Sequence, residues 1–339
     1  MKKIVSIMSV YIGLIIGAGF ASGREIFEFF NLSRPNSAIG IIVAASFFAI
    51  VSYVIMKMSG SIGSNSLDDF IGKTTGPLAT MVKWFMLFYM FCGFFVMMSG
   101  SGALIEKTFN LPYIYGISFL SLICFVVFSF DLKGLVALNT IMVPVMIVGI
   151  FFLCISSALW SDVPAFSQAE SIRRNPIVSA ICYVAYNTIT AGAVLIPLSA
   201  QSSKKQLIKA AVLSSSILGV LIFVVWKSLN IYYSLIFESE MPLLDIASTH
   251  GKTYSIIYTV VLFMALCTTA VSHGFGIMSK FTFKNLRKRM LFAAGICLSA
   301  IPFAKIGFSR LVSDLYSFFG FVGIVWMIWL LFLYAKSSC

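Results

Sequence analysis

Charged side chains are scarce in this chain of 339 residues, where Asp, Glu, Lys and Arg together account for 11% of the sequence. Soluble globular domains carry about 25% charged residues. Hydrophobic residues make up 60% of the chain, and its mean hydropathy is +0.99. This composition excludes an ordinary soluble domain. Long apolar runs separated by short polar breaks predict an all-α integral membrane protein with about ten helices, each crossing a hydrocarbon core of ~30 Å.

The side chains that most enzymes need are also rare. The chain has two histidines, and it contains no HExxH, GxSxG or phosphate-binding loop motif. Its seven cysteines form no CxxC pair, and six of them lie in apolar segments. We interpret the cysteines as small buried hydrophobes rather than disulfides or metal ligands. An enzyme is therefore the least expected class of function.

No small-residue cleavage pattern follows the first apolar run, so we expect this run to be retained as a membrane span. The expected spans are 4–30, 37–58, 77–104, 112–130, 134–159, 176–200, 206–235, 253–283, 289–304 and 310–335.

A formal net charge of +12 raises the question of nucleic-acid binding, but the cations follow the loops. With a cytoplasmic N-terminus, most Lys and Arg fall on the inner side, as the positive-inside rule requires. We therefore expect a multi-pass protein of the cytoplasmic (cell) membrane with both termini in the cytoplasm. The basic segment from Lys280 to Arg289 is then a loop that faces anionic lipid headgroups. No nucleic-acid partner is expected, and the sequence carries no signal for an oligomeric state.

The chain divides into two halves of five spans, because spans of the second half start at a similar distance along the sequence from their counterparts in the first half. An odd number of spans reverses the second copy, which predicts a 5+5 inverted repeat: residues 1–160, an extracytoplasmic linker at 161–175, and residues 176–339. The first span of each half is expected to be discontinuous. Glycines interrupt the first span, and polar residues precede Gly192 in the sixth. The alternative is close helix packing through small residues.

The string GAGFASGREI, at Gly17 to Ile26, and the pair Tyr186-Asn187 in the sixth span carry a resemblance over essentially the whole chain. With ten spans in 5+5 order, they resemble the amino acid–polyamine–organocation superfamily, which has the leucine-transporter fold. Within it, the sequence is most similar to the bacterial YkvI-like amino acid permease family.

The resemblance implies a Na⁺ site between the first and eighth spans. Sodium-coupled members of this fold use two carbonyls before the first break, one carbonyl in the eighth span and two hydroxyls that follow it. Aligned on the glycines, the carbonyls are those of Gly13, Ile16 and Ala265, and the hydroxyls are those of Thr268 and Thr269. Neutral oxygens of this kind suit a hard monovalent cation. The alternative is that both threonines bond to carbonyls of their own helix.

The expected substrate is a small amino acid or a related zwitterion. Backbone N–H groups at the first break would attract a carboxylate. Groups in the third and sixth spans and the Glu25 carboxylate would line the rest of the pocket. The candidate substrate-binding residues are Ala18, Gly19, Phe20, Ser22, Gly23, Glu25, Tyr89, Gly93, Tyr186, Asn187 and Thr190.

Three further ionisable residues lie inside the expected spans, where charge is costly and often functional. Arg24 and Glu28 are spaced to pair as i and i+4, either as a structural pair or as an outer gate. His273 lies one turn beyond Thr269, as a hydrogen-bonded bundle residue, an inner gate or a proton relay.

These observations predict a secondary active transporter that works by alternating access, with Na⁺ as the coupling ion and no organic cofactor. Two alternatives remain open. One is a proton-coupled or exchange transporter of the same fold that uses Glu25 or His273. The other is an amino-acid-sensing membrane receptor that does not transport.

Overall fold

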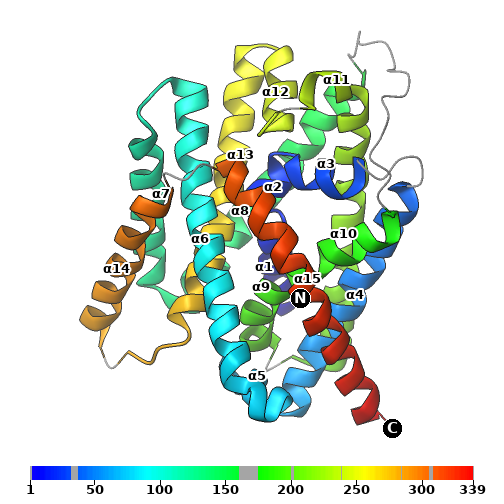
Figure 1. Cartoon of the computed structure of the whole chain (residues 1–339), viewed down its shortest axis with the longest axis vertical. Helices are drawn as coiled ribbons and strands as arrows, with labels where there is room; N and C mark the ends of the chain where they lie inside the picture. The colour runs from blue at the N-terminus through cyan, green and yellow to red at the C-terminus, as the bar shows by residue number, and fades with distance from the viewer. Residues whose placement is uncertain are drawn as a thin grey trace.

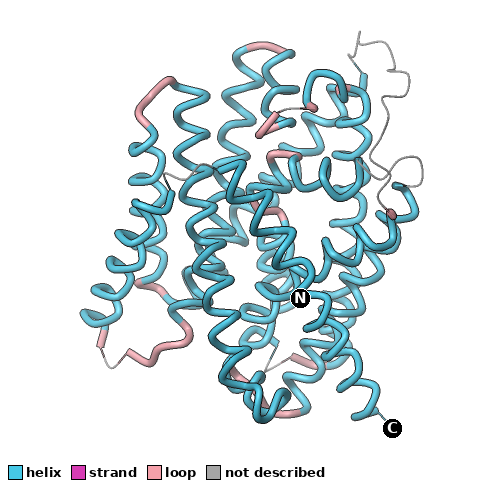
Figure 2. The backbone as a smooth tube through the Cα atoms, viewed as in Figure 1, coloured by secondary structure: helices cyan, strands magenta, loops and turns pink. Residues whose placement is uncertain are grey.

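The structure is a computed structural model, and it describes residues 2–31, 37–159, 175–199, 202–237, 239–283, 285–304 and 308–338. The described part of the chain is a bundle of long helices without strands, as Figures 1 and 2 show. Seven of these helices are long and apolar enough to cross a membrane by length and composition alone. The expected all-α, multi-pass membrane architecture is confirmed.

Each expected span has a helical counterpart. The first span comprises α1 (Lys2–Ile15), α2 (Ala18–Ala21) and α3 (Arg24–Phe30). The others are α4 (Ser37–Ser61), α6 (Ala79–Phe109), α7 (Tyr113–Phe128), α8 (Asp131–Leu159), α9 (Pro176–Ser199), α10 (Lys204–Ile231), α13 (Lys252–Met278), α14 (Leu286–Ala304) and α15 (Phe308–Ser338). Short helices that were not predicted lie between them: α5 (Leu67–Thr75), the 3-10 helix η2 (Gly76–Leu78), α11 (Tyr233–Ile236) and α12 (Pro242–Thr249).

The first span is interrupted twice, as its glycines predict. Gly17 adopts an extended conformation between α1 and α2. Gly23, between α2 and α3, has a φ of 82°, in the left-handed region that glycine tolerates far better than other residues. The glycines therefore mark real breaks in the helix.

The predicted break in the sixth span is wrong, because α9 is one continuous helix. Polar side chains here bond back to carbonyls of their own helix instead of marking an unwound segment. Asn187 Nδ2 donates to the Tyr183 carbonyl at 2.9 Å, and Thr188 Oγ1 donates to the Val184 carbonyl at 2.7 Å. Such bonds satisfy polar side chains within an intact helix.

Several helices of one half pack against the counterparts of the helices that their own counterparts contact in the other half. α1 packs against α8 and α10, and its counterpart α9 packs against α15 and α4. α6 packs against α13, and α4 against α10, each pair being made of corresponding helices. This is the pairing that a repeat of five helices predicts. Residues 160–174, which include nearly all of the expected linker, lie outside the described residues.

The two ends of the bundle carry different elements. Figure 1 shows α5, the chain that leads into α14 and the C-terminus at the lower end, with α11 and α12 at the upper end. The basic segment expected in the cytoplasm comprises the chain that leads into α14 and the first turn of this helix, so it lies at the same end as the C-terminus.

Candidate functional site

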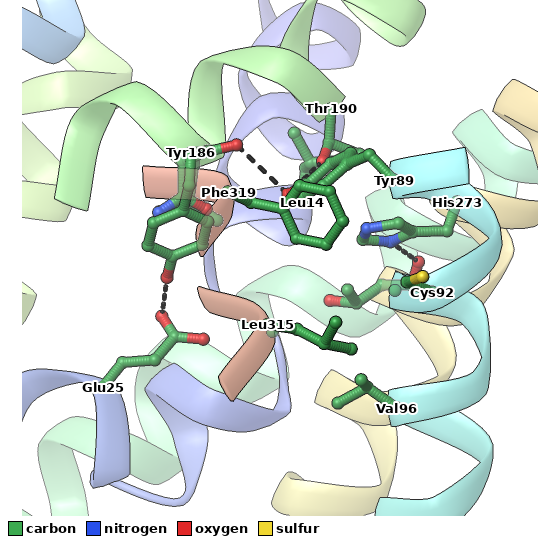
Figure 3. Close-up of a pocket in the computed structure, with 15 residues that line it drawn as sticks. Leu14, Glu25, Tyr89, Cys92, Val96, Tyr186, Thr190, His273, Leu315 and Phe319 are labelled. Atoms are coloured by element: carbon green, nitrogen blue, oxygen red, sulfur yellow. Dashed lines mark hydrogen bonds between the residues drawn. The ribbon is translucent and has the colours of Figure 1, made fainter. Parts of the chain in front are cut away.

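A small cavity lies where the interrupted first span meets the bundle. Its volume is about 20 Å³, which is room for little more than one water molecule. Figure 3 shows residues from several helices around it, with Glu25 and His273 on opposite sides and Phe319 between them. The lining residues are Leu14, Ile15, Gly17, Glu25, Tyr89, Cys92, Gly93, Val96, Tyr186, Asn187, Thr190, Thr269, His273, Leu315 and Phe319.

Glu25 brings a carboxylate into the bundle. The residue is only 4% exposed, and the Tyr186 hydroxyl donates a hydrogen bond to its Oε2 (Figure 3). The carboxylate folds back over Gly19, where a Cβ atom would overlap Oε1. The site therefore joins a carboxylate of the first half to a hydroxyl of the second, and Gly19 makes room for it.

Tyr89 on α6 organises the opposite wall. Its hydroxyl donates to the Tyr186 carbonyl at 3.1 Å and accepts a bond from Thr190 Oγ1 at 3.0 Å. Its ring packs edge-on against Phe319 of α15, with ring centroids 4.6 Å apart. Aromatic and hydroxyl groups thus meet at one end of the cavity, an arrangement suited to a ligand with apolar and polar parts.

His273 has one defined tautomer, because its Nδ1 lies 2.9 Å from the Thr269 carbonyl, which can only accept. Nδ1 is therefore the donor, and the neutral ring keeps Nε2 as an acceptor. That nitrogen lies against Gly93, where a Cβ would overlap it. His273 is bonded to its own helix, yet it presents an acceptor at the wall of the cavity.

Three of the five oxygens expected to bind sodium meet at one point. Thr268 Oγ1 lies 3.1 Å from the Gly13 carbonyl and 3.1 Å from the Ala265 carbonyl. Gly13 is in the last turn of α1, where carbonyls lack their usual partners within the helix. A hydroxyl has one proton, so it cannot donate fully to both carbonyls. Thr268 therefore does not bond to its own helix alone, because its hydroxyl also contacts the Gly13 carbonyl of α1.

The other two expected ligands lie at the same junction. Thr269 Oγ1 is buried without a hydrogen-bond partner, and it faces Gly17, where a Cβ would lie 2.8 Å from it. Ile16, which is fully buried, immediately precedes Gly17 in the interruption. The structure thus brings Ile16, Gly17 and Thr269 together.

The backbone of the second interruption is bonded within the protein. N–H groups of Ala21, Ser22 and Gly23 donate to carbonyls within the same segment. Tyr258 Oη donates to the Ala21 carbonyl at 2.6 Å, and Leu243 N donates to the Ser22 carbonyl at 2.8 Å. The remaining expected residues of this segment do not line the cavity either: Ala18, Gly19, Phe20, Ser22 and Gly23.

Arg24 and Glu28 form the expected i, i+4 ion pair at 2.7 Å. Arg24 Nη1 also donates to the Ser239 carbonyl at 3.1 Å, and the Ser239 hydroxyl bonds to Asp245 of α12. Asp245 is in turn paired with Lys107, at the end of α6, at 2.7 Å. The pair therefore belongs to a polar network that ties α3 to α12 and α6.

Some lining residues were not predicted. Leu315 and Phe319 come from α15, and no motif distinguishes them from other apolar residues of that helix. Cys92 and Val96 lie one turn from Tyr89 or Gly93, and helical spacing from these two residues would have found them.

Comparisons with known proteins agree with this architecture. No family model matches the chain. It is similar to the "Uncharacterized membrane protein YkvI" of Bacillus subtilis, with 28% identity over 318 residues that cover 92% of this chain and 90% of the relative. It is also similar to the "Uncharacterized protein YyaD" of the same organism, with 27% identity over 315 residues that cover 92% and 91% of the two chains.

Solved structures of transporters share the fold. MhsT in complex with L-phenylalanine superposes with a TM-score of 0.70 at 16% identity, over 95% of this chain and 87% of that chain. The chain has the leucine-transporter fold. A Na⁺-coupled sialic acid symporter in a substrate-bound outward-open state gives 0.69 at 13% identity, over 95% and 76%. The manganese transporter of Eremococcus coleocola gives 0.57 at 13% identity, over 96% and 75%.

Proposed function

We propose that this protein is a secondary active transporter that couples inward movement of Na⁺ to uptake of a small amino acid or related zwitterion. The observation that carries the proposal is the position of Thr268 Oγ1, 3.1 Å from carbonyls of both Gly13 and Ala265. The buried Thr269 hydroxyl, which has no hydrogen-bond partner, lies at the same junction of α1 and α13.

These groups suit a hard monovalent cation. One hydroxyl proton cannot satisfy two carbonyls, whereas a cation among these oxygens would contact every one of them. The oxygens are neutral, so the site can release its ion without stranding a buried carboxylate. Lys and Arg are absent from the described part of α8 after Lys133, so that stretch offers no fixed positive charge to replace the ion.

The cavity matches the chemistry of a zwitterion in part. Glu25 provides a carboxylate for an ammonium group, and Tyr89, Tyr186 and Thr190 provide hydroxyls close by. A volume of about 20 Å³ holds no amino acid, so the cavity must widen for the substrate to enter. We infer that the first span and α15 move apart to admit it, as in alternating access. The shared fold with MhsT and the sialic acid symporter supports this class of function.

A proton-coupled transporter is the second candidate, favoured by the buried carboxylate of Glu25 and by the acceptor nitrogen of His273 on the cavity wall. The third is a receptor of the same fold, which binds an amino acid but accumulates none. In each case we propose a cytoplasmic membrane location with both termini inside the cell. The positive-inside rule favours this orientation, and the basic segment and the C-terminus share one end of the bundle.

A thermal-shift screen of amino acids on the purified protein, run in NaCl and in KCl at equal ionic strength, tests the proposal. Selective stabilisation by one amino acid, stronger in NaCl, is expected because a ligand stabilises the state that binds it. Equal stabilisation in both salts would overturn sodium coupling. Counterflow in proteoliposomes then separates a transporter from a receptor, since a receptor gives no accumulation.

A further inference from the structure

Asn139, in the first third of α8, is a buried polar residue to which the proposed cation site of α1 and α13 assigns no role. It is 0% exposed, and its Nδ2 donates to the Leu135 carbonyl one turn earlier at 2.9 Å. Its other polar atom, Oδ1, is buried without a hydrogen-bond partner. The amide nitrogen is therefore hydrogen-bonded to its own helix, whereas the amide oxygen has no hydrogen-bond partner.

The unpartnered oxygen is directed at α1. A Cβ built on Gly13 would overlap Asn139 Oδ1 and would lie 2.6 Å from Val143 Cγ2. The orientation of the amide is fixed, because only the nitrogen can donate to the Leu135 carbonyl. Gly13 thus has the Asn139 oxygen beside its Cα and the Thr268 hydroxyl at its carbonyl.

A purely structural role accounts for only part of this arrangement. Asparagine in a membrane helix often bonds back to its own helix, and Nδ2 does so here. An amide oxygen buried without a partner is nevertheless costly, and valine or leucine at this position would avoid that cost. A ligand that takes the oxygen would offset it.

We propose that Asn139 Oδ1 is a ligand of the coupling cation, so that the site draws oxygens from three helices: α1, α8 and α13. The inference rests on the proposed sodium coupling. α8 packs against both α1 and α13, so it can bring the Asn139 oxygen to Gly13, beside the junction of those two helices. Gly13 allows this approach because any larger residue would displace the amide.

An amide oxygen has a chemical consequence for coupling. It contributes a strong dipole to a hard cation without adding net charge, and it does not titrate. Cation binding at this site should therefore depend on Na⁺ and stay nearly constant between pH 6 and pH 8.

The test uses Na⁺ itself as the probe. Thermal stability of the detergent-purified full chain is titrated with NaCl, with choline chloride holding the ionic strength constant. The variants are Asn139→Leu, which keeps the shape but removes the oxygen, and Asn139→Asp, which keeps an oxygen and adds charge. Thr140→Val is the matched control, because Thr140 also bonds back one turn, to the Val136 carbonyl at 2.7 Å, but on the exposed side of α8.

We expect Asn139→Leu to raise the half-saturating Na⁺ concentration about tenfold or more, as loss of a supporting ligand does elsewhere. Thr140→Val should leave it unchanged. Asn139→Asp should bind Na⁺ at pH 8 at least as tightly as the wild type and should lose affinity as the pH falls, because its carboxylate then protonates.

The outcomes separate the two proposals. If Na⁺ does not stabilise the wild type, sodium coupling fails and the role of Asn139 fails with it. If Na⁺ stabilises the wild type and Asn139→Leu shifts the titration no more than Thr140→Val does, only the Asn139 ligand is overturned. Should Asn139→Leu fail to fold, Asn139→Asp decides alone: a titration that does not change with pH would overturn the inference.

Discussion

The Tyr186 hydroxyl of α9 donates a hydrogen bond to the Glu25 carboxylate of α3, and this bond links the two halves of the chain inside the bundle. A carboxylate as buried as this one needs donors, because an unpaired charge in a low-dielectric interior is costly. Tyr186 supplies one of these donors, and its own carbonyl is bonded by Tyr89. The interrupted first span is thereby fixed to α9 and α6 at the cavity.

Removal of this donor is expected to destabilise the protein. Tyr186→Phe leaves the carboxylate short of a hydrogen bond, at a cost of about 1–3 kcal/mol. In a Glu25→Gln background the same change should cost less, because the amide carries no charge. Thermal unfolding of the two single variants and the double variant measures this coupling. Additive effects would contradict the link, and the exposed Tyr115→Phe serves as a control that should change nothing.

Loss of the hydroxyls at the α1–α13 junction should abolish the response to sodium. Thr268→Ala removes the oxygen that contacts both Gly13 and Ala265, and Thr269→Ala removes the unpartnered hydroxyl. Thr269→Ser keeps a hydroxyl and should preserve the response. Stabilisation by NaCl relative to KCl is the measurement.

Ser272→Ala is the matched control for the threonine variants. Its hydroxyl is buried on the same helix and donates to the Thr268 carbonyl at 2.8 Å, but it is not one of the proposed sodium ligands. Sodium stabilisation that survives in the Thr268→Ala, Thr269→Ala double variant would rule out the assigned ligands.

The second interruption should depend on glycine. At Gly23, φ is 82°, and a Cβ would lie 2.9 Å from Leu243 Cγ, so Gly23→Ala should destabilise by about 1–2 kcal/mol or more from the backbone term alone. Gly60 lies in the helix α4 with open space at its Cβ position. Gly60→Ala should therefore raise stability by about 0.5–1 kcal/mol. Equal melting temperatures for the two variants would show that the break is not held in this conformation.

The polar network around Arg24 is expected to restrict access more than it stabilises the fold. The paired side chains of Arg24 and Glu28 are 22% and 27% exposed, and pairs of this kind contribute about 0–1 kcal/mol. Arg24→Gln should instead free α3 from the Ser239 carbonyl and speed modification of Cys92, which lines the cavity, by a thiol reagent.

The labelling rate, read by mass spectrometry of the Cys92 peptide, checks the prediction on Arg24. Lys73→Gln breaks a comparable i, i+4 pair with Asp69, on α5 at the other end of the bundle, and should leave the rate unchanged. If both variants label like the wild type, the network does not control access.

Sequence patterns predicted those parts of the site that depend on local chemistry. Gly23 adopts the left-handed conformation that favours glycine, and Gly17 is extended and leaves no room for a Cβ beside Thr269 Oγ1, so both positions are marked by a residue type that is visible in the sequence. Helical spacing placed Ala265, Thr268 and Thr269 on one face, and in the structure Thr268 contacts the Ala265 carbonyl while Thr269 faces Gly17 of the first span. Arg24 and Glu28 pair because i and i+4 are neighbours on a helix.

Other features depend on contacts that sequence spacing does not encode. Polar residues such as Asn187 and Thr188 occur in unwound segments, and they also occur in intact helices, where their side chains bond to backbone carbonyls. Only the three-dimensional structure decides between the two. Phe319 enters the cavity because α15 crosses α9 and α6. Asn139 could have been singled out from the sequence, since a buried amide in an apolar span is costly without a hydrogen-bond partner or ligand.

Uptake of a radiolabelled amino acid by proteoliposomes tests the central claim most directly, with the amino acid chosen by the thermal-shift screen. The account predicts accumulation above equilibrium when an inward Na⁺ gradient is imposed, with no accumulation when K⁺ replaces Na⁺ and no loss when the pH gradient is collapsed. Accumulation that ignores Na⁺ and disappears with the pH gradient would contradict it.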